Sequence, residues 1–537
     1  MSPTVRDTLL LAVVAAALFL PWLGARDLWN PNEPVYGQAV AEMAARGEWL
    51  IPTVNGAVFA EKPILYFWMA LGAARILGEV SEFALRLPSA LAGIASVLLV
   101  GLLARPYAGR RRSVVAALLL ATTFVVFWSA RQVQMDLLLA ACVLAAVLGA
   151  TRSIDGLWTP ARGWVLAGAA AGLGLLAKGP LGCILPALVV AGYAMITGRF
   201  RRAAHPALAL GILACALVAL PWYVLLWTRG ETAFLNELLV RQNLTRFVEP
   251  WDHRAPSWYY LRYFWIDMAP WAWFVPLAYG LRPRDERERR LHVLAWTWVL
   301  VVVVFFSLSS SKRSPYILPA APAVSLLVSG VVERWLALDL ARWRVRALLA
   351  LQCALGLGLL AAGALLAVGV PGLPQLPPEG AAAVRVTAAA FLLGGGLMLG
   401  GLLAAGRRTL LAPAAAVLAL ALVYAGAAAF ALPAADAFKS ARPLCEAIRS
   451  HVGPHAPLRG FHDWRWRAGY SFYLGRPIQN LETLDELREY WSRPERLYLI
   501  VERGRLDRAR EVIGDRPPLA SRAIGSNAGY LFSNHPE

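Results

Sequence analysis

Charged residues and metal-binding side chains are scarce in this sequence. Only 16% of the 537 residues are charged, whereas 58% are hydrophobic. This composition lies far from that of soluble globular proteins and predicts a polytopic membrane protein. The five cysteines and seven histidines show no spacing typical of a metal site. Four cysteines lie within apolar segments, and the lone one outside them, Cys445, excludes an intramolecular disulfide in an exported region.

Acidic residues are also in deficit. The chain has 52 Lys and Arg against 34 Asp and Glu, a net charge of +18 that could indicate nucleic-acid binding. The basic residues, however, fall in short clusters between apolar runs. That distribution is the positive-inside pattern of membrane proteins, so we expect no nucleic-acid partner.

No small-residue cleavage pattern follows the first apolar run, residues 8–25, so we interpret this run as a membrane span rather than a signal peptide. A search for stretches of about 20 apolar residues predicts about thirteen spans. They lie near residues 8–25, 83–104, 113–129, 134–151, 163–178, 181–197, 206–227, 269–281, 292–309, 316–333, 346–369, 382–405 and 409–431.

Arginine clusters set the expected orientation. With a cytoplasmic N-terminus, the clusters at 105–112, 199–202, 282–290, 342–346 and 407–408 all fall in cytoplasmic connections. Residues 26–82, 229–268 and everything after 432 then lie outside the cytoplasm, in a multi-pass membrane protein. The short apolar stretch 64–77 is expected to be an interfacial helix, and the long aromatic loop 229–268 a lid.

The composition changes after Pro433. Residues 439–452, 483–493 and 505–514 have helical spacing, whereas 458–464 and 496–502 are typical of strands. We therefore expect a mainly α fold with two domains: a polytopic transmembrane helical domain at 1–432, and a small soluble α/β domain at 433–537.

Ionisable residues near membrane segments are costly and therefore candidates for function. The loop at residues 30–63 contains Glu33, Tyr36, Glu61 and Lys62, and four further polar residues lie at the same predicted ends of distant spans: Asp136, Lys178, Lys312 and Arg313. Carboxylates and cations are thus expected in one exoplasmic layer.

Such a mixture suits transfer of a group from a lipid phosphate. Cations stabilise the leaving phosphate, and a carboxylate accepts the proton of the attacking hydroxyl. Lys62, Lys178 and Lys312 or Arg313 are candidates for the first task, and Glu33 or Glu61 for the second. A carboxylate could instead hold a divalent metal.

Each residue also has a simpler interpretation. Lys178 could snorkel to the interface, and Asp136 could cap the helix that it begins. His253 could form only loop hydrogen bonds, and Tyr259 and Tyr260 could be interfacial belt aromatics. The predicted convergence favours the functional interpretation of the set.

Six ordered patches resemble the polytopic C-type glycosyltransferases, specifically the lipid A aminoarabinose transferase branch related to protein O-mannosyltransferases. They are NEPVYGQAVAEM, GEWLIPTVNGAVFAEKPILYFW, QVQMDLLLA, LLAKGPLGCILP, NLTRFVEPWDHRAPSWYY and FFSLSSSKRSPYILP, within the first 330 or so residues.

The resemblance implies an integral membrane glycosyltransferase that moves a sugar from polyprenyl (undecaprenyl) phosphate to an envelope acceptor such as lipid A. It maps catalytic roles onto Glu61 and Asp136, phosphate or substrate binding onto Lys62, Lys178 and Tyr316, and a metal role onto His253 together with Glu61. The implied cofactor is a divalent metal ion, with no nucleotide or organic cofactor.

The first patch departs from the family pattern. The family reads Asp-Glu-Pro-Arg-Tyr, whereas this chain has Asn32-Glu33-Pro34-Val35-Tyr36. An amide accepts no proton at neutral pH, so Asn32 cannot replace the aspartate as a base. We expect Asn32 and Tyr36 to bind substrate. Three alternatives follow: Glu33 or Glu61 supplies the carboxylate, activation rests on the leaving group, or the protein is a non-catalytic lipid-linked sugar binding protein or flippase. A transferase acting on protein hydroxyls is a further alternative.

Overall fold

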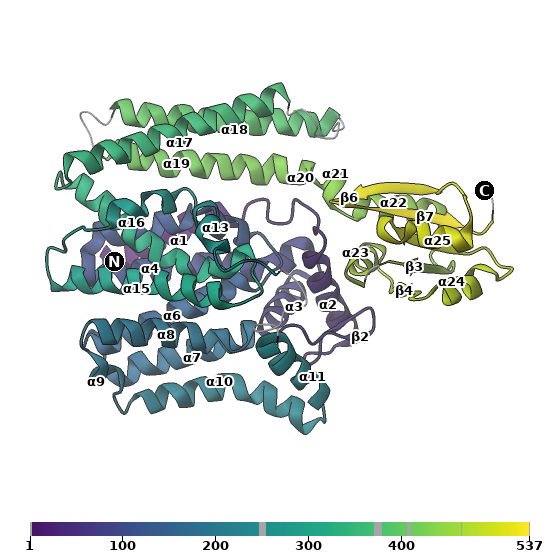
Figure 1. Ribbon diagram of the computed structural model, residues 1–537, viewed down its shortest axis with the longest axis horizontal. Coiled ribbons are helices and arrows are strands. Elements are labelled where there is room, and N and C mark those ends of the chain that lie inside the picture. The colour runs from purple at the N-terminus through teal and green to yellow at the C-terminus, as the bar shows by residue number, and fades with distance from the viewer. Residues whose placement is uncertain (1–2, 246–253, 370–377, 405–409, 463, 536–537) are drawn as a thin grey trace.

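The computed structural model describes residues 3–245, 254–369, 378–404, 410–462 and 464–535. Helices dominate these residues, as expected for the transmembrane domain (Figure 1). Within them, nine helical segments are long and apolar enough to cross a membrane. These are Glu82–Ala121 (α4), Asp136–Ile154 (α6), Pro160–Lys178 (α7), Leu208–Thr228 (α10), Glu286–Leu308 (α15), Ser314–Leu336 (η3 and α16), Arg342–Val368 (α17), Gly380–Ala404 (in α18, Pro378–Ala404) and Leu411–Ala434 (α19, η4 and α20).

Helix α4 accounts for two of the predicted spans. Its 40 residues are interrupted at Gly109, where φ is 75°, a left-handed value that glycine adopts at no steric cost. The chain therefore reverses near Gly109, as predicted for a cytoplasmic connection. The second half continues through Ala121 into the short helix α5 (Phe124–Ala130).

Other predicted spans are shorter or broken. Helices α1 (Pro3–Phe19) and α8 (Leu181–Ile196) have 17 and 16 residues, and the expected span 269–281 consists of η2 (Trp271–Phe274) and α14 (Val275–Ala278). The total of thirteen spans therefore stays a prediction. The connecting helices are α9 (Phe200–Ala203), α11 (Thr232–Asn236), the π-helix η1 (Glu237–Thr245) and α13 (Tyr259–Asp267).

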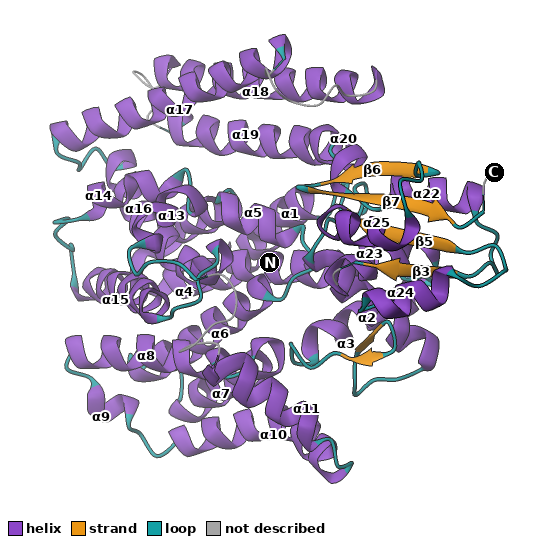
Figure 2. Ribbon diagram, turned by 45° about the vertical axis from the view of Figure 1, so that its right-hand side comes forward, coloured by secondary structure: helices purple, strands orange, loops and turns teal. Residues whose placement is uncertain are grey.

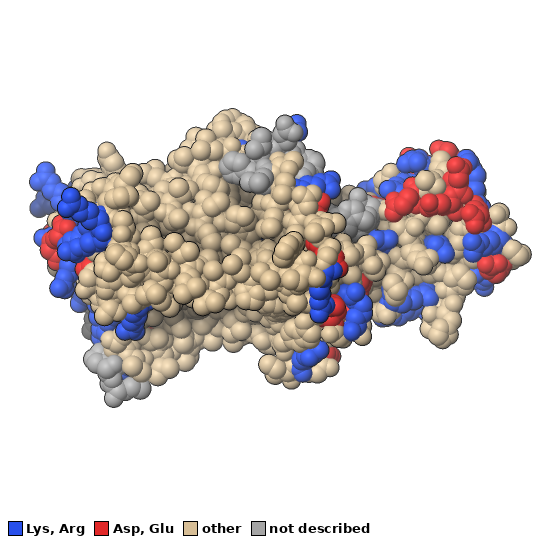
Figure 3. Space-filling model, turned by 90° about the horizontal axis from the view of Figure 1, so that it is seen from below, with Lys and Arg blue, Asp and Glu red and all other residues tan. Residues whose placement is uncertain are grey.

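The helices form three groups (Figure 1). Helices α17, α18 and α19 lie together along one side of a central group that includes α1, α4 and α16, while α6, α7, α8 and α10 lie on the opposite side. The charged residues visible in Figure 3 gather at the two ends of the bundle and leave a broad uncharged middle, as membrane burial requires.

One end of the bundle is held by buried ion pairs between helices. Arg112 of α4 and Arg334 of α16 lie 2.9 Å and 3.2 Å from the carboxylate of Glu288, near the start of α15. We call this the basic end. The loops at 26–82 and the C-terminal sheet lie at the other, the loop end (Figure 2).

The first loop has its own small architecture. It contains α2 (Asn32–Arg46), a hairpin of β1 (Thr53–Val54) and β2 (Ala57–Val58), and α3 (Leu65–Leu77). Helix α2 ends at Gly47 in the left-handed conformation, a common helix terminator. The predicted short helix at 64–77 is present as α3.

The tail is a mixed α/β structure, and all five predicted elements are present in it. Its sheet has the strand order β4-β3-β5-β7-β6, with β3 parallel to β4 and β5 and the other pairs antiparallel. The strands are β3 (Leu458–Phe461), β4 (Gln479–Asn480), β5 (Tyr498–Glu502), β6 (Ala520–Ile524) and β7 (Asn527–Ser533). The helices are α21 (Asp436–Lys439), α22 (Arg442–His451), α23 (Trp464–Leu474), α24 (Leu484–Trp491), η5 (Arg503–Arg505) and α25 (Leu506–Ile513).

The tail packs tightly onto the first loop. Leu444 and Tyr470 belong to the same buried cluster as Leu28 and Tyr36, whereas the opposite face of the sheet has a separate core. Asp436 accepts hydrogen bonds from the Asp27 backbone (2.9 Å) and the Trp29 indole (2.6 Å). The shared core fixes the tail against the loop that precedes α2; the predicted boundary at 432/433 stays a prediction.

Candidate active site

A cavity of about 340 Å³ at the loop end gathers residues from five separate segments. Polar and apolar side chains share its wall, as in ligand-binding pockets generally. Its lining comprises Glu61, Lys62 and Pro63 before α3; Lys178, Pro180, Leu181 and Ile184 at the α7–α8 junction; Leu238, Gln242 and Asn243 of η1; Phe305, Phe306, Ser309 and Ser311 near the end of α15; and Tyr316 of η3.

Lys178, the last residue of α7, is fixed from two sides. Its ammonium forms an ion pair with Asp136, the first residue of α6, and lies 4.5 Å from the centroid of the Tyr316 ring. The carboxylate of Asp136 is buried. The predicted residues Asp136, Lys178 and Tyr316 thus contact one another. A lysine that only snorkels to the interface would not need both of these contacts.

Lys62 and Glu61 occupy the same wall of the cavity. The Lys62 ammonium donates a hydrogen bond to the Glu61 backbone carbonyl at 3.1 Å. Lysine is rare in this chain, with only four residues, and two of them, Lys62 and Lys178, line this one cavity. The remaining basic residues of the sequence, apart from Lys312 and Lys439, are arginines.

Tyr36 of α2 lies behind the cavity lining. Its ring packs edge-on against Phe59 and Phe67, with centroids 6.1 Å and 6.3 Å away. Burial raises the pKa of the Tyr36 hydroxyl, the Glu61 carboxylate raises it further, and Arg313 opposes both. Glu61 and Arg313 are therefore within electrostatic range of Tyr36, as the predicted convergence requires.

Lys312 is a structural anchor in this arrangement. Its buried ammonium donates hydrogen bonds to the backbone carbonyls of Ala255, at 3.1 Å, and Ser309. Burial lowers the pKa of Lys312. The side chain thereby ties the end of loop 229–268 to the segment before Tyr316, and it is not part of the cavity lining.

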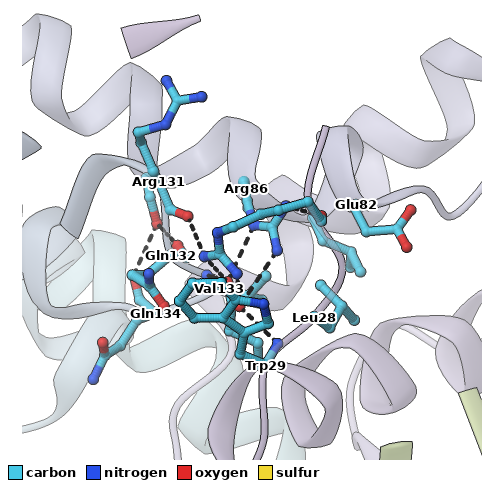
Figure 4. Close-up of polar contacts among 12 residues, drawn as sticks. Leu28, Trp29, Glu82, Arg86, Arg131, Gln132, Val133 and Gln134 are labelled. Atoms are coloured by element: carbon cyan, nitrogen blue, oxygen red, sulfur yellow. Dashed lines mark hydrogen bonds and ion pairs between the residues drawn. The ribbon is translucent and has the colours of Figure 1, made fainter. Parts of the chain in front are cut away.

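Glu33 is buried in an ion-pair network rather than exposed to the cavity. Its carboxylate accepts hydrogen bonds from the guanidinium groups of Arg26 (2.6 Å) and Arg86 (3.1 Å). The backbone N–H groups of Trp29 (3.0 Å) and Val133 (2.9 Å) complete its coordination. Figure 4 shows Trp29, Arg86 and Val133 close together, with dashed lines marking the hydrogen bonds and ion pairs among the residues drawn.

This network explains the protonation state of Glu33. Burial alone would raise the pKa of Glu33, but the charges of Arg26 and then Arg86 outweigh it and lower the pKa to about 2. A carboxylate with so low a pKa is a poor proton acceptor at neutral pH. The arrangement favours an architectural role for Glu33 over the predicted catalytic one.

Asn32 begins α2 beside Glu33 and is partly buried. The predicted metal ligand His253 lies outside the described residues. Among the residues that are described, no group of three or more His, Cys, Asp or Glu side chains could hold a metal ion. The metal site at Glu61 and His253 therefore stays a prediction.

The sequence analysis did not identify Arg86 and Asp267, which contact residues at or near the candidate site. Arg86 has no exposed surface and lies within the predicted span 83–104, where an ionisable residue is itself a signal. Asp267, at the end of α13, accepts a hydrogen bond from Ser314 at 2.6 Å, two residues before Tyr316. Asp267 lies at the end of an aromatic loop and outside the predicted spans, so the sequence did not mark it as a candidate.

The chain is similar in sequence and in fold to known glycosyltransferases. Residues 61–227 match the dolichyl-phosphate-mannose-protein mannosyltransferase family. The undecaprenyl phosphate-alpha-4-amino-4-deoxy-L-arabinose arabinosyl transferase 1 of Pseudomonas fluorescens (strain Pf0-1) is 35% identical over 319 residues, 58% of this chain and 55% of the relative. The corresponding transferase of Pseudomonas aeruginosa (strain LESB58) is 33% identical over 336 residues, 61% of this chain and 60% of the relative. In sequence the chain thus spans less than two thirds of the length of the curated relatives it matches.

The whole fold matches a solved structure. ArnT from Cupriavidus metallidurans superimposes with a TM-score of 0.78 in the form bound to undecaprenyl phosphate, over 98% of both chains and at 22% sequence identity. The apo form gives a TM-score of 0.79 over 99% of both chains, also at 22% identity. The predicted resemblance is therefore confirmed: this chain has the fold of the polytopic C-type glycosyltransferases, and about 60% of it is similar in sequence to the aminoarabinose transferases.

Proposed function

We propose that this protein transfers a sugar from undecaprenyl phosphate to an envelope acceptor such as lipid A, at the periplasmic face of the bacterial inner membrane. The observation that carries the proposal is the cavity that combines Lys62, Lys178, Tyr316 and Glu61 beside apolar side chains. The names of the similar transferases support the donor class.

The lysines and the carboxylate have different roles in the reaction. An acceptor oxygen attacks the anomeric carbon of the donor, and the bond from that carbon to the phosphate oxygen breaks, so the bonding pair leaves with the phosphate. Lys62 and Lys178 stabilise the departing anion, as cations placed where charge develops do. The acceptor proton passes to a carboxylate, for which Glu61 is the candidate that lines the cavity.

Asp136 and Tyr316 hold Lys178 in place. Their contacts with the ammonium leave it facing the cavity while restricting its motion, and such preorganisation is what makes a cation effective in catalysis. A divalent metal, if bound, would be held by Glu61 with His253 and would supply further positive charge near the phosphate.

The orientation supports a periplasmic reaction. The arginine clusters at 105–112, 199–202, 282–290 and 342–346 lie at the basic end, opposite the cavity, and the positive-inside rule assigns that end to the cytoplasm. The N-terminus would then be cytoplasmic and the C-terminal sheet periplasmic, where its contact with the first loop suits it to orient an acceptor.

One observation favours a second candidate. Asn32 replaces the aspartate of the family's first patch, and Glu33 beside it is fully engaged in ion pairs. A lipid-linked sugar binding protein without catalysis would tolerate both features. Incubation with labelled donor and lipid A separates the two: transfer supports the enzyme, and saturable donor binding without product over long times supports the binding protein.

The acceptor is tested in cells. Mass spectrometry of envelope lipids and proteins with and without the gene should show loss of one sugar from lipid A. Loss of a sugar from a protein hydroxyl instead would identify a protein as the acceptor. The proposed donor would be unchanged.

A further inference from the structure

A second, larger cavity lies between the helix groups, away from the candidate active site. It has a volume of about 640 Å³ and separates α1, α4 and α16 from α17, α18 and α19. Figure 1 shows α17, α18 and α19 lying together beside the central group. The wall is almost entirely apolar, formed by residues such as Leu118, Trp335, Leu348, Met398 and Ala414.

Away from the two arginines, the wall offers few polar groups to a soluble ligand. Gln352 is the polar side chain there, and it donates its hydrogen bond to the Ala412 carbonyl at 2.8 Å. Protein interiors are close-packed, so an apolar space of this size between membrane helices requires an occupant. A lipid acyl chain has the matching chemistry.

The mouth of the cavity is positively charged. Arg110 and Arg111, at the turn between the two halves of α4, line it. Asp7 accepts hydrogen bonds from Nε and one terminal nitrogen of Arg110, both at 2.8 Å, and it also pairs with Arg105 at 2.9 Å. Two guanidinium groups thus share one carboxylate, and Arg111 beside them is exposed.

An excess of arginine at the mouth of an apolar cleft fits an anionic headgroup. Basic pockets between membrane helices on the cytoplasmic side bind acidic phospholipids, and each basic residue near the surface contributes about 1 kcal/mol. A zwitterionic headgroup would gain little from the same charges, because its amine would face the guanidinium groups.

We propose that this cleft is a binding site for one anionic phospholipid of the leaflet at the basic end. Its acyl chains fill the space between the central helices and α17–α19, and its phosphate contacts Arg111 and the remaining terminal nitrogen of Arg110. The lipid thereby adds contacts between two helix groups that also meet directly, where the Tyr424 ring of α19 stacks on Phe127 of α5 at 4.2 Å. The proposal is independent of the transferase activity.

The test is native mass spectrometry of the full chain in detergent, titrated separately with phosphatidylglycerol and phosphatidylethanolamine. Wild-type protein should retain one phosphatidylglycerol in preference to phosphatidylethanolamine. Arg111→Gln should weaken phosphatidylglycerol binding about fivefold, the equivalent of 1 kcal/mol. Arg201→Gln, an exposed arginine of α9 outside the cleft, is the matched control and should bind as wild type does.

A second variant pair tests the cleft itself. Ala414→Trp fills the space from an exposed lining position and should abolish retention of the lipid, whereas Leu217→Trp places the same side chain on an exposed face of α10 and should not. Equal retention of both lipids by wild-type protein, or retention unchanged by Ala414→Trp, would overturn the proposal.

Discussion

Arg86 meets Glu33 across 53 residues of sequence, with its Nε 3.1 Å from a carboxylate oxygen of Glu33, in a position where neither side chain is appreciably exposed. Removing one partner of a buried ion pair costs about 3–5 kcal/mol, because the other charge stays buried. Glu33→Gln should therefore lower the free energy of unfolding by that amount, measured by denaturation in detergent.

The exposed Glu79 provides the control, since Glu79→Gln removes a carboxylate from the same loop without a buried partner. The pH dependence has a definite sign. Because the pKa of Glu33 is lowered to about 2, its stabilisation is full above the ordinary value of 4.5 and is lost as the pH falls toward 2. A Glu33→Gln protein as stable as Glu79→Gln at pH 7 would contradict the architectural role.

Asn32→Asp restores the carboxylate of the family pattern at the first residue of α2. A negative charge is favourable at a helix N-terminus, so the variant should fold normally. If the wild type catalyses transfer without this carboxylate, the variant should raise an existing kcat by about tenfold or more, since general bases contribute about 10²–10⁴-fold. Initial rates with labelled donor measure this, with Asn32→Ser as the neutral control. Transfer by the variant but none by wild type would favour the binding-protein alternative.

Asp267 should make stability fall as the pH rises. Burial raises the pKa of Asp267 from 3.8 to about 6, with the hydrogen bond from Ser314 opposing it. Between these values the folded state holds the proton that the unfolded state has released, so stability decreases with pH through this window. Asp267→Asn should remove that slope and stabilise the protein by about 1–3 kcal/mol at pH 7.5.

Thermal unfolding of both proteins at pH 5 and 7.5 tests this prediction. The stabilisation by Asp267→Asn should be roughly half as large at pH 5, which lies inside this window, as at pH 7.5. A difference that is the same at both values, or larger at pH 5, would show that Asp267 does not titrate as its burial requires.

Arg442 should hold the C-terminal sheet to the first loop. Its Nε lies 2.7 Å from Asp27, and it also pairs with Glu82. Partly exposed pairs contribute at most about 1 kcal/mol each. Arg442→Ala should therefore accelerate limited proteolysis after Pro433 about fivefold, whereas Arg488→Ala, which breaks an exposed pair within α24, should leave the rate unchanged.

The sequence was sufficient for much of the fold and for the centre of the site. Apolar length and arginine placement identified the helical bundle, and the five elements predicted in the tail are all present. Lys178 ends a membrane helix and Tyr316 lies near the start of another, while Lys62 lies in the loop before α3, and all three line one cavity at the same end of the bundle, as the loop pattern predicted.

Side-chain direction could not be predicted in the same way. Glu33 and Asn32 are adjacent, but only the structure shows that Glu33 points into a buried network with Arg26 and Arg86. Lys312 likewise turns toward backbone carbonyls although Ser309 and Ser311 beside it line the cavity. Some of the partners, such as Arg86 for Glu33 and Ala255 for Lys312, lie more than 50 residues away, and a single sequence carries no signal for them.

The measurement that tests the account most directly is release of undecaprenyl phosphate from a labelled undecaprenyl phosphate–aminoarabinose donor, with lipid A as acceptor. Wild-type protein and Lys439→Ala, which alters an exposed lysine of the tail, should release it at equal rates. Lys62→Ala should reduce release at least a hundredfold, as loss of a charge-stabilising group in a catalytic site does. Undiminished release by Lys62→Ala would contradict the assignment of this cavity as the site of transfer.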